Sequence, residues 1–220
     1  MKRYCSAVIL AVASIGAHAV PVAWTDWTSV SGNLAEGTIN VNGTSIGVSV
    51  ASTSGYYTSH IDSGTANPWG AVWSGPAYTN GSVDNAPVSE FLGFGTGGTV
   101  TVTFDQTVRG VYLAMNSWEN QSVNFGEAIT VDSSGPGNWG GTGAYTPYAN
   151  GEGFTTGGNP DGNWHGVVSL SGSRMGFSFT HNTELWHGIT VGIAEVPAPA
   201  TFALFAAALL ALGFVKRRTA

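Results

Sequence analysis

Two short segments of this sequence repeat the same three residues immediately before an apolar run. One is Trp164-His165-Gly166 and the other is Trp186-His187-Gly188. Tryptophan rings stack well on other ring systems, and histidine donates hydrogen bonds or ligates metals. Because side chains alternate across a strand, each tryptophan should face away from the histidine that follows it.

The repeat has three interpretations. If both segments enter the same end of one sheet, Trp164, His165, Trp186 and His187 form a shelf that binds a sugar, and we retain them as binding candidates. A metal site would add Glu184 or Asp161 to the two histidines. The structural interpretation places the tryptophans over the core and lets the histidines hydrogen-bond to loops. We assign no metal site and no cofactor.

Carboxylate pairs are a second possible source of chemistry, because glycoside hydrolysis uses two of them. The candidates are Glu119, Glu127 and Glu184, and their spacing places no two of them together on one strand. The only Gly-x-Ser-x-Gly match, at residues 43–47, falls at the Asn42-Gly43 turn signal and not between a strand and a helix, so it does not predict a nucleophile elbow. We therefore expect a protein that is not an enzyme, assign no catalytic residue, and keep a secreted glycosidase as the third alternative.

The elements that must position these residues are short and β-rich. They are separated by Gly, Asn, Ser and Pro, and sustained helical periodicity is missing from residues 20–195. Asn42-Gly43 predicts a hairpin turn between two of the runs. We expect about nine strands in an all-β, antiparallel two-sheet β-sandwich that is jelly-roll-like. The expected strands are 37–41, 44–51, 98–104, 108–115, 128–131, 166–170, 174–180 and 188–193, with Tyr56 and Tyr57 starting another.

Three of these expectations concern connections between the runs. Turns at 105–107 and 171–173 should make hairpins of the neighbouring strands, so that 166–170, 174–180 and 188–193 form a meander. Residues 62–90 form a long loop that contains Trp69 and Trp73. Because tryptophan is costly to leave in water, this loop should fold back on the sheets.

Residues 20–195 form the expected ectodomain, and their number, 176, is suited to one domain. The charge of this ectodomain limits its partners. It holds all 13 acidic residues, and Arg109 and Arg174 are its only basic ones, so two positive and thirteen negative charges give −11. Nucleic acid and anionic lipid should be repelled by such a surface. We expect no nucleic-acid partner.

The first 19 residues are predicted to be a secretory signal peptide. Lys2 and Arg3 precede a short apolar run, and Ala17 and Ala19 form a small-x-small cleavage site. Cys5 would leave with this peptide, so a disulfide or a cysteine nucleophile is not expected in residues 20–220.

Residues 196–220 combine three parts in a fixed order. Val196, Pro197, Ala198, Pro199, Ala200 and Thr201 come first, then an uncharged apolar run to Val215, then Lys216, Arg217 and Arg218. The prolines stop helix from extending backwards, and 201–215 is expected to be a transmembrane helix, short at roughly 22 Å against a bilayer core of about 30 Å. The basic residues should stay cytoplasmic, which puts the ectodomain on the outside of the inner membrane.

This tripartite tail resembles the PEP-CTERM sorting signal of Gram-negative bacteria, with Ala198 where that family usually has Glu. The resemblance implies that exosortase, a membrane transpeptidase, recognises and processes the tail. The Gly-Thr-Ile-Asn-Val, Thr-Val-Thr-Phe and Trp-His-Gly-Ile-Thr-Val-Gly-Ile runs also look like other PEP-CTERM ectodomains. We expect an exported protein of the cell envelope, cell surface or extracellular matrix without catalytic activity. The alternative is a β-sandwich module that binds carbohydrate or exopolysaccharide.

Overall fold

The computed structural model describes residues 19–61, 72–81, 83–87, 90–158 and 162–194. Apart from Ala19, the expected signal peptide lies outside these residues, as does the whole tail from Val196 with its expected helix 201–215. Within the described residues, no helix is long and apolar enough to cross a membrane.

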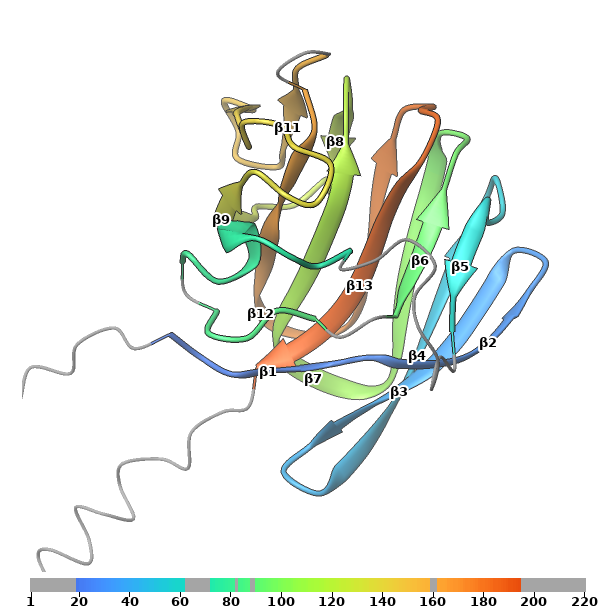
Figure 1. The fold of residues 1–220 in the computed structure, drawn as a ribbon. Helices are drawn as coiled ribbons and strands as arrows, with labels where there is room; N and C mark the ends of the chain where they lie inside the picture. The colour runs from blue at the N-terminus through green and yellow to red at the C-terminus, as the bar shows by residue number, and fades with distance from the viewer. Residues whose placement is uncertain (1–18, 62–71, 82, 88–89, 159–161, 195–220) are drawn as a thin grey trace, which may run out of the picture.

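The described chain is all-β and antiparallel, as the sequence predicts (Figure 1). Hydrogen bonds join its strands into one 13-stranded sheet, so the arrangement as a two-sheet jelly roll stays a prediction. One short 3-10 turn, η1 (Pro76–Tyr78), accompanies the sheet. The strands are β1 Val22–Trp24, β2 Asp26–Ser31, β3 Leu34–Val41, β4 Thr44–Ser52, β5 Thr58–His60, β6 Phe91–Phe94, β7 Gly98–Trp118, β8 Ser122–Asn124, β9 Thr130–Gly135, β10 Tyr145–Pro147, β11 Gly153–Thr156, β12 Trp164–His181 and β13 His187–Ala194.

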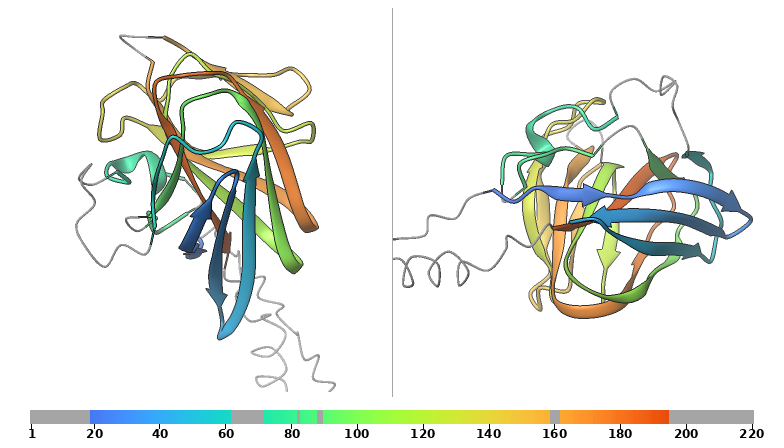
Figure 2. Two further views of the ribbon diagram at one scale, coloured as in Figure 1. Left: turned by 90° about the vertical axis from the view of Figure 1, so that its right-hand side faces the viewer. Right: turned by 90° about the horizontal axis from the view of Figure 1, so that it is seen from below.

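A long ribbon of two strands, β7 and β12, runs through the whole sheet. Its register extends from Gly98 paired with His181 to Trp118 paired with Trp164. The first half of the ribbon is flanked by β4 and β8, and the second half by β13 and β9. The ribbon bends between these halves, at the bottom of Figure 1, and Figure 2 shows the same bend from two further sides.

The bend corrects two expectations about turns. Residues 105–107 do not close a hairpin but form a bulge inside β7, where residues 104–107 lie opposite the single residue Met175 of β12. Residues 171–173 likewise lie within β12, at a register shift between Leu170 and Ser173. The expected meander is therefore wrong, because β12 and β13 lie on opposite sides of β7. Bulges and turns use the same Gly and polar residues, and only the strand partners separate them.

The hairpin at Asn42-Gly43 is confirmed. Residue pairing closes at Val41 and Thr44. The two turn residues have φ of 50° and 79°, the left-handed values that an Asn-Gly hairpin turn needs. The last expected strand is confirmed as well, as β13.

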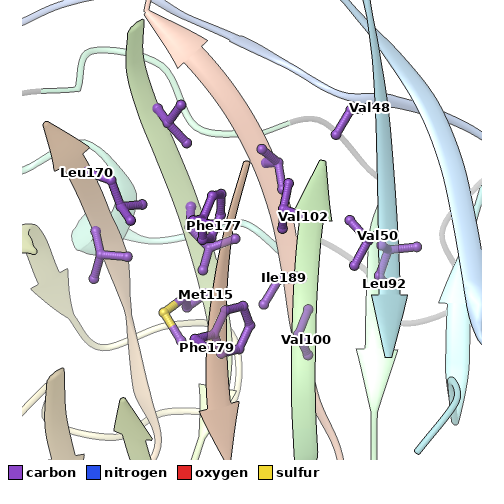
Figure 3. Close-up of a cluster of buried hydrophobic side chains, with 14 of the residues drawn as sticks. Val48, Val50, Leu92, Val100, Val102, Met115, Leu170, Phe177, Phe179 and Ile189 are labelled. Carbon is purple, nitrogen blue, oxygen red and sulfur yellow. The ribbon is translucent and has the colours of Figure 1, made fainter. Parts of the chain in front are cut away.

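The main core lies between the two halves of the ribbon. Val100, Val102 and Phe104 alternate with exposed threonines in the first half of β7, as the sequence pattern predicts. They belong to the same buried cluster as Leu113 and Met115 from the second half. Figure 3 shows side chains of both halves and of β13 meeting in this cluster.

A second, smaller core covers the outer face of the second half of the ribbon. Trp73 and Tyr78 are buried there against Ala114 and Val167. The described part of the 62–90 segment therefore folds back onto the sheet, as expected, while Trp69 lies outside the described residues.

Each glycine of the repeated Trp-His-Gly segments lies beneath the tryptophan two residues before it. A Cβ on Gly166 would lie 2.6 Å from the ring of Trp164 and 2.3 Å from the carbonyl of Ser133, and a Cβ on Gly188 would lie 3.3 Å from the ring of Trp186. Residues i and i+2 share a strand face, so an indole can lie flat over the strand only when position i+2 has no side chain. This packing explains the repeat in structural terms.

We predict that Gly166→Ala lowers the free energy of unfolding by about 1–3 kcal/mol, because the added methyl group has no space between the ring and the carbonyl. Gly157→Ala is the matched control, since a Cβ there meets nothing within 4 Å. It should change stability by less than about 0.5 kcal/mol. Chemical denaturation measures both, and equal stability of the two variants would contradict the packing argument.

Candidate functional site

Three of the four binding candidates are buried. Trp164, His165 and His187 have no exposed surface, and only Trp186 is partly exposed. The two segments also lie on opposite sides of β7. The four side chains therefore do not form one exposed shelf, and the tryptophan that is accessible belongs to a different site.

His165 has a structural environment. The backbone N–H of Ser117 donates to its Nδ1 over 3.2 Å, and the hydroxyl of Tyr78 lies 3.3 Å from the same atom. An N–H can only donate, so Nδ1 accepts and the neutral ring carries its hydrogen on Nε2. Burial lowers the pKa of His165 to about 4.

A pair of buried histidines lies at the start of β13. Nε2 of His187 is 2.8 Å from Nδ1 of His181, the last residue of β12. The ring of Trp118 covers His187 with a centroid distance of 4.4 Å. Burial lowers the pKa of His187 to about 3, and the neighbouring His181 lowers it further. Burial also lowers the pKa of His181.

Glu184 links this histidine pair to the protein surface. Its Oε2 lies 3.3 Å from Nδ1 of His187, without the alignment of a hydrogen bond. The same oxygen accepts the backbone N–H of Glu119 and the side-chain amide of Gln121, each over 3.1 Å. Burial raises the pKa of Glu184 to about 8, and the charge of Glu119 adds to the rise against these hydrogen bonds. Glu184 is therefore mostly protonated at neutral pH.

A cleft of about 320 Å³ opens beside Glu184. This is within the range of roughly 300–1,000 Å³ for small-molecule sites. The cleft contains both apolar and polar side chains from five separate segments. Its lining residues are Tyr57, Ser117, Glu119, Trp139, Asn163, Glu184, Leu185 and Trp186.

The apolar wall of the cleft is unusually exposed. Tyr57 is 65 % exposed and Leu185 is 86 % exposed. Trp139 meets Trp186 at a centroid distance of 5.1 Å and an angle of 64° between the rings. Tyr57, Trp139 and Leu185 are three of the five large hydrophobic side chains exposed in the described chain. Their gathering at one cleft makes it the candidate interaction site.

The polar side of the cleft is held in place by the end of β7. Ser117 has a φ of 59°, a left-handed value that is costly for a residue other than glycine. This conformation accompanies a register shift opposite Trp164 and Gly166. It directs the Ser117 hydroxyl to Asn163 Oδ1 at 3.2 Å. Strain of this kind is commonly found at functional sites.

The structure separates the three candidate carboxylates. Glu119 and Glu184 line the cleft together. Glu127 instead forms an ion pair of 2.7 Å with Arg174, and it is not among the lining residues. Of the proposed metal ligands, Asp161 lies outside the described residues. Among the side chains that are described, no group of three or more His, Cys, Asp or Glu is placed to hold a metal ion.

Sequence reasoning missed most of the cleft wall. Trp139 lies in a Gly-rich connection and Leu185 in the short loop between β12 and β13. A large apolar residue in a polar loop is the signal that could identify both, as it does for the tryptophans of residues 62–90. Comparison with protein-family models, with curated proteins and with solved structures finds no match to this chain. The lining of the cleft, which combines aromatic rings with two carboxyl groups, is suited to hydroxyl-bearing or cationic ligands.

The buried groups predict a stability maximum near neutral pH. The lowered pKa values of His165, His181 and His187 mean that the unfolded chain binds more protons, so stability is lost as pH falls below about 6.5. The raised pKa of Glu184 has the opposite effect on stability, because here the folded protein binds the extra proton. The stability that this proton contributes is lost as pH rises from about 4.5 towards 8.

Denaturant midpoints measured from pH 4 to 9 test this expectation. Glu184→Gln should remove the part of the loss that occurs as pH rises between about 6.5 and 8, while keeping the steep loss below 6.5. Glu152→Gln serves as the control, because that carboxylate bonds only to its neighbour Asn150 in an exposed loop. A variant profile parallel to that of the parent protein would contradict the assigned role of Glu184.

Proposed function

We propose that this chain is an exported, non-catalytic protein of the cell envelope or extracellular matrix whose β domain binds a polysaccharide through the cleft. The observation that carries the proposal is the gathering of Tyr57, Trp139, Leu185 and Trp186 around one cleft. Aromatic rings stack on the apolar faces of sugar rings, and stacking of this kind requires accessible side chains. Ser117, Glu119 and Asn163 supply groups for hydrogen bonds to hydroxyls.

The position of the cleft supports this role. Glu184, Leu185 and Trp186 come directly before β13, and Ala194 ends it. Seven residue steps of strand separate the two ends by roughly 23 Å. The chain continues from Ala194 towards its tail, so the cleft lies at the end of β13 that is remote from the tail. A tethered protein would present such a cleft to its surroundings.

The route to the envelope is proposed from the sequence. Residues 1–19 direct export, and the tail from Val196 is the substrate of an exosortase-type transpeptidase in the inner membrane. We also propose that the sheet forms a jelly-roll-like sandwich of two layers. The different neighbours of the two halves of the β7–β12 ribbon support that arrangement.

A glycosidase is the second candidate. Glu119 and Glu184 share the cleft, and burial raises the pKa of Glu184 to about 8, which suits a general acid. Two hydrogen bonds to its Oε2 and the nearby ring of His187 give Glu184 a structural role as well. Release of reducing ends from a panel of polysaccharides, lost in Glu184→Gln, would favour this candidate over the binding protein.

Polysaccharide binding depends on the exposed rings. We predict that Trp139→Ala and Tyr57→Ala each weaken retention on an immobilised polysaccharide by about tenfold or more, because truncating an exposed ring removes its stacking surface. Both rings are substantially exposed, so the unfolding midpoint should change little. Affinity electrophoresis of the full-length protein against a set of polysaccharides measures the effect.

Met175→Ala is the matched control, since Met175 is 54 % exposed and does not line the cleft. It should bind like the parent protein. Binding that survives both ring truncations, or that fails equally in Met175→Ala, would contradict the assignment of the cleft.

Processing of the tail is predicted to leave a C-terminus near Pro199 or Ala200. The apolar run is short for a lasting membrane span, and the two prolines keep the preceding segment extended for a peptidase. Mass spectrometry of the envelope-associated protein tests this. Neutral replacements of Lys216, Arg217 and Arg218 should release unprocessed chain into the periplasm or medium. Mature protein that still carries residues 202–220 would indicate a plain anchor.

A further inference from the structure

We infer that the cleft selects ligands that carry an ammonium group, so that the polysaccharide bound there is one with free amino sugars. The ammonium preference follows from the cleft itself. Its extension to a polysaccharide rests on the function proposed above.

The aromatic wall provides the first argument. Tyr57, Trp139 and Trp186 line one cleft, and the two indoles are inclined at 64° with their centroids 5.1 Å apart. The indoles therefore meet edge to face, and a group bound in the cleft contacts this aromatic lining. A cation within about 6 Å of an aromatic centroid is attracted by the ring's electron density, and tryptophan is the strongest partner.

The carboxyl groups provide the second argument. Glu119 and Glu184 lie on the polar side of the same cleft. Glu184 carries a proton at neutral pH because it is buried beside Glu119. A cation bound next to these groups would favour the ionised form of Glu184. Its binding would therefore be coupled to the release of a proton.

The placement of the positive charges provides the third argument. Arg109 and Arg174 are the only cations of residues 20–195, and neither lines the cleft. Arg109 donates to Ser173 Oγ and Arg174 pairs with Glu127, both at the bend of the ribbon. Eight residue steps along β7 place Arg109 roughly 26 Å from Ser117. The cleft therefore offers no cation to a uronate, sulfate or phosphate group.

Isothermal titration of the full-length protein, in a mild non-ionic detergent at pH 6, distinguishes the ligand classes. The probes are a glucosamine hexamer, the N-acetylglucosamine hexamer of equal length and tetramethylammonium chloride. The glucosamine hexamer should bind about tenfold or more tightly than its neutral acetylated form, which corresponds to about 1.4 kcal/mol. Tetramethylammonium should compete with it.

Glu119→Gln should reduce the ratio of the affinities for the charged and the neutral hexamer at least about fivefold, because it removes a negative charge from the cleft. Glu152→Gln removes the same charge outside the cleft and should have little effect. At pH 7, the binding of tetramethylammonium should release a proton, seen as a heat that depends on the buffer. Glu184→Gln should abolish this release, because the probe itself does not titrate.

The outcomes separate the inference from the proposed function. Equal affinity for the two hexamers would overturn the ammonium preference and leave polysaccharide binding intact. Tetramethylammonium binding without binding of either hexamer would uphold the ammonium site and overturn the polysaccharide function. Equal losses in Glu119→Gln and Glu152→Gln, or equally tight binding of hexalysine, would show attraction to the overall negative charge and overturn the inference.

Discussion

The antiparallel pairing of β7 with β12 is the interaction on which the rest of the structure depends. Each strand alone exposes two edges, and together they hold every larger group of strands in the described chain, with β4 and β13 on one side and β8 and β9 on the other. Because the ribbon bends, its two halves bury their apolar faces against each other in one cluster. The bend therefore creates the buried core, which a flat two-stranded ribbon would not have.

The bend also determines where charge and chemistry are found. The bulged residues at the bend bring Arg109 and Arg174 together with Ser173 and Glu127. The strand ends at the other limit of the second half bring in the buried histidines, Glu184 and the aromatic cleft. Both arginines of the described chain therefore lie at the bend and away from the cleft, although nothing in the composition requires it.

Glu184 connects the interior with the cleft. Its Oε2 accepts hydrogen bonds from Glu119 and Gln121 of the β7–β8 connection and lies near His187 of β13, so the carboxyl is held in place by two segments. Fixing a carboxyl group in a partly buried position is costly for its ionised form. The carboxyl group of Glu184 therefore stays protonated at neutral pH. In the inference drawn above, a bound cation would favour its ionised form.

The sequence by itself determined the local features: the all-β class, the Asn42-Gly43 hairpin, the alternation in the first half of β7 and the acidity of residues 20–195. These depend on backbone preference, side-chain period and charge, which act between near neighbours. Only the tertiary structure decided whether 105–107 and 171–173 were turns or bulges, because both use the same residues and differ only in which strand lies opposite. It also decided that His165 and His187 are buried, while Trp139, Leu185 and Tyr57 share a cleft with Glu119 and Glu184. Burial and clefts are formed by segments that are distant in sequence. The sequence alone does not specify how far apart these segments lie in space.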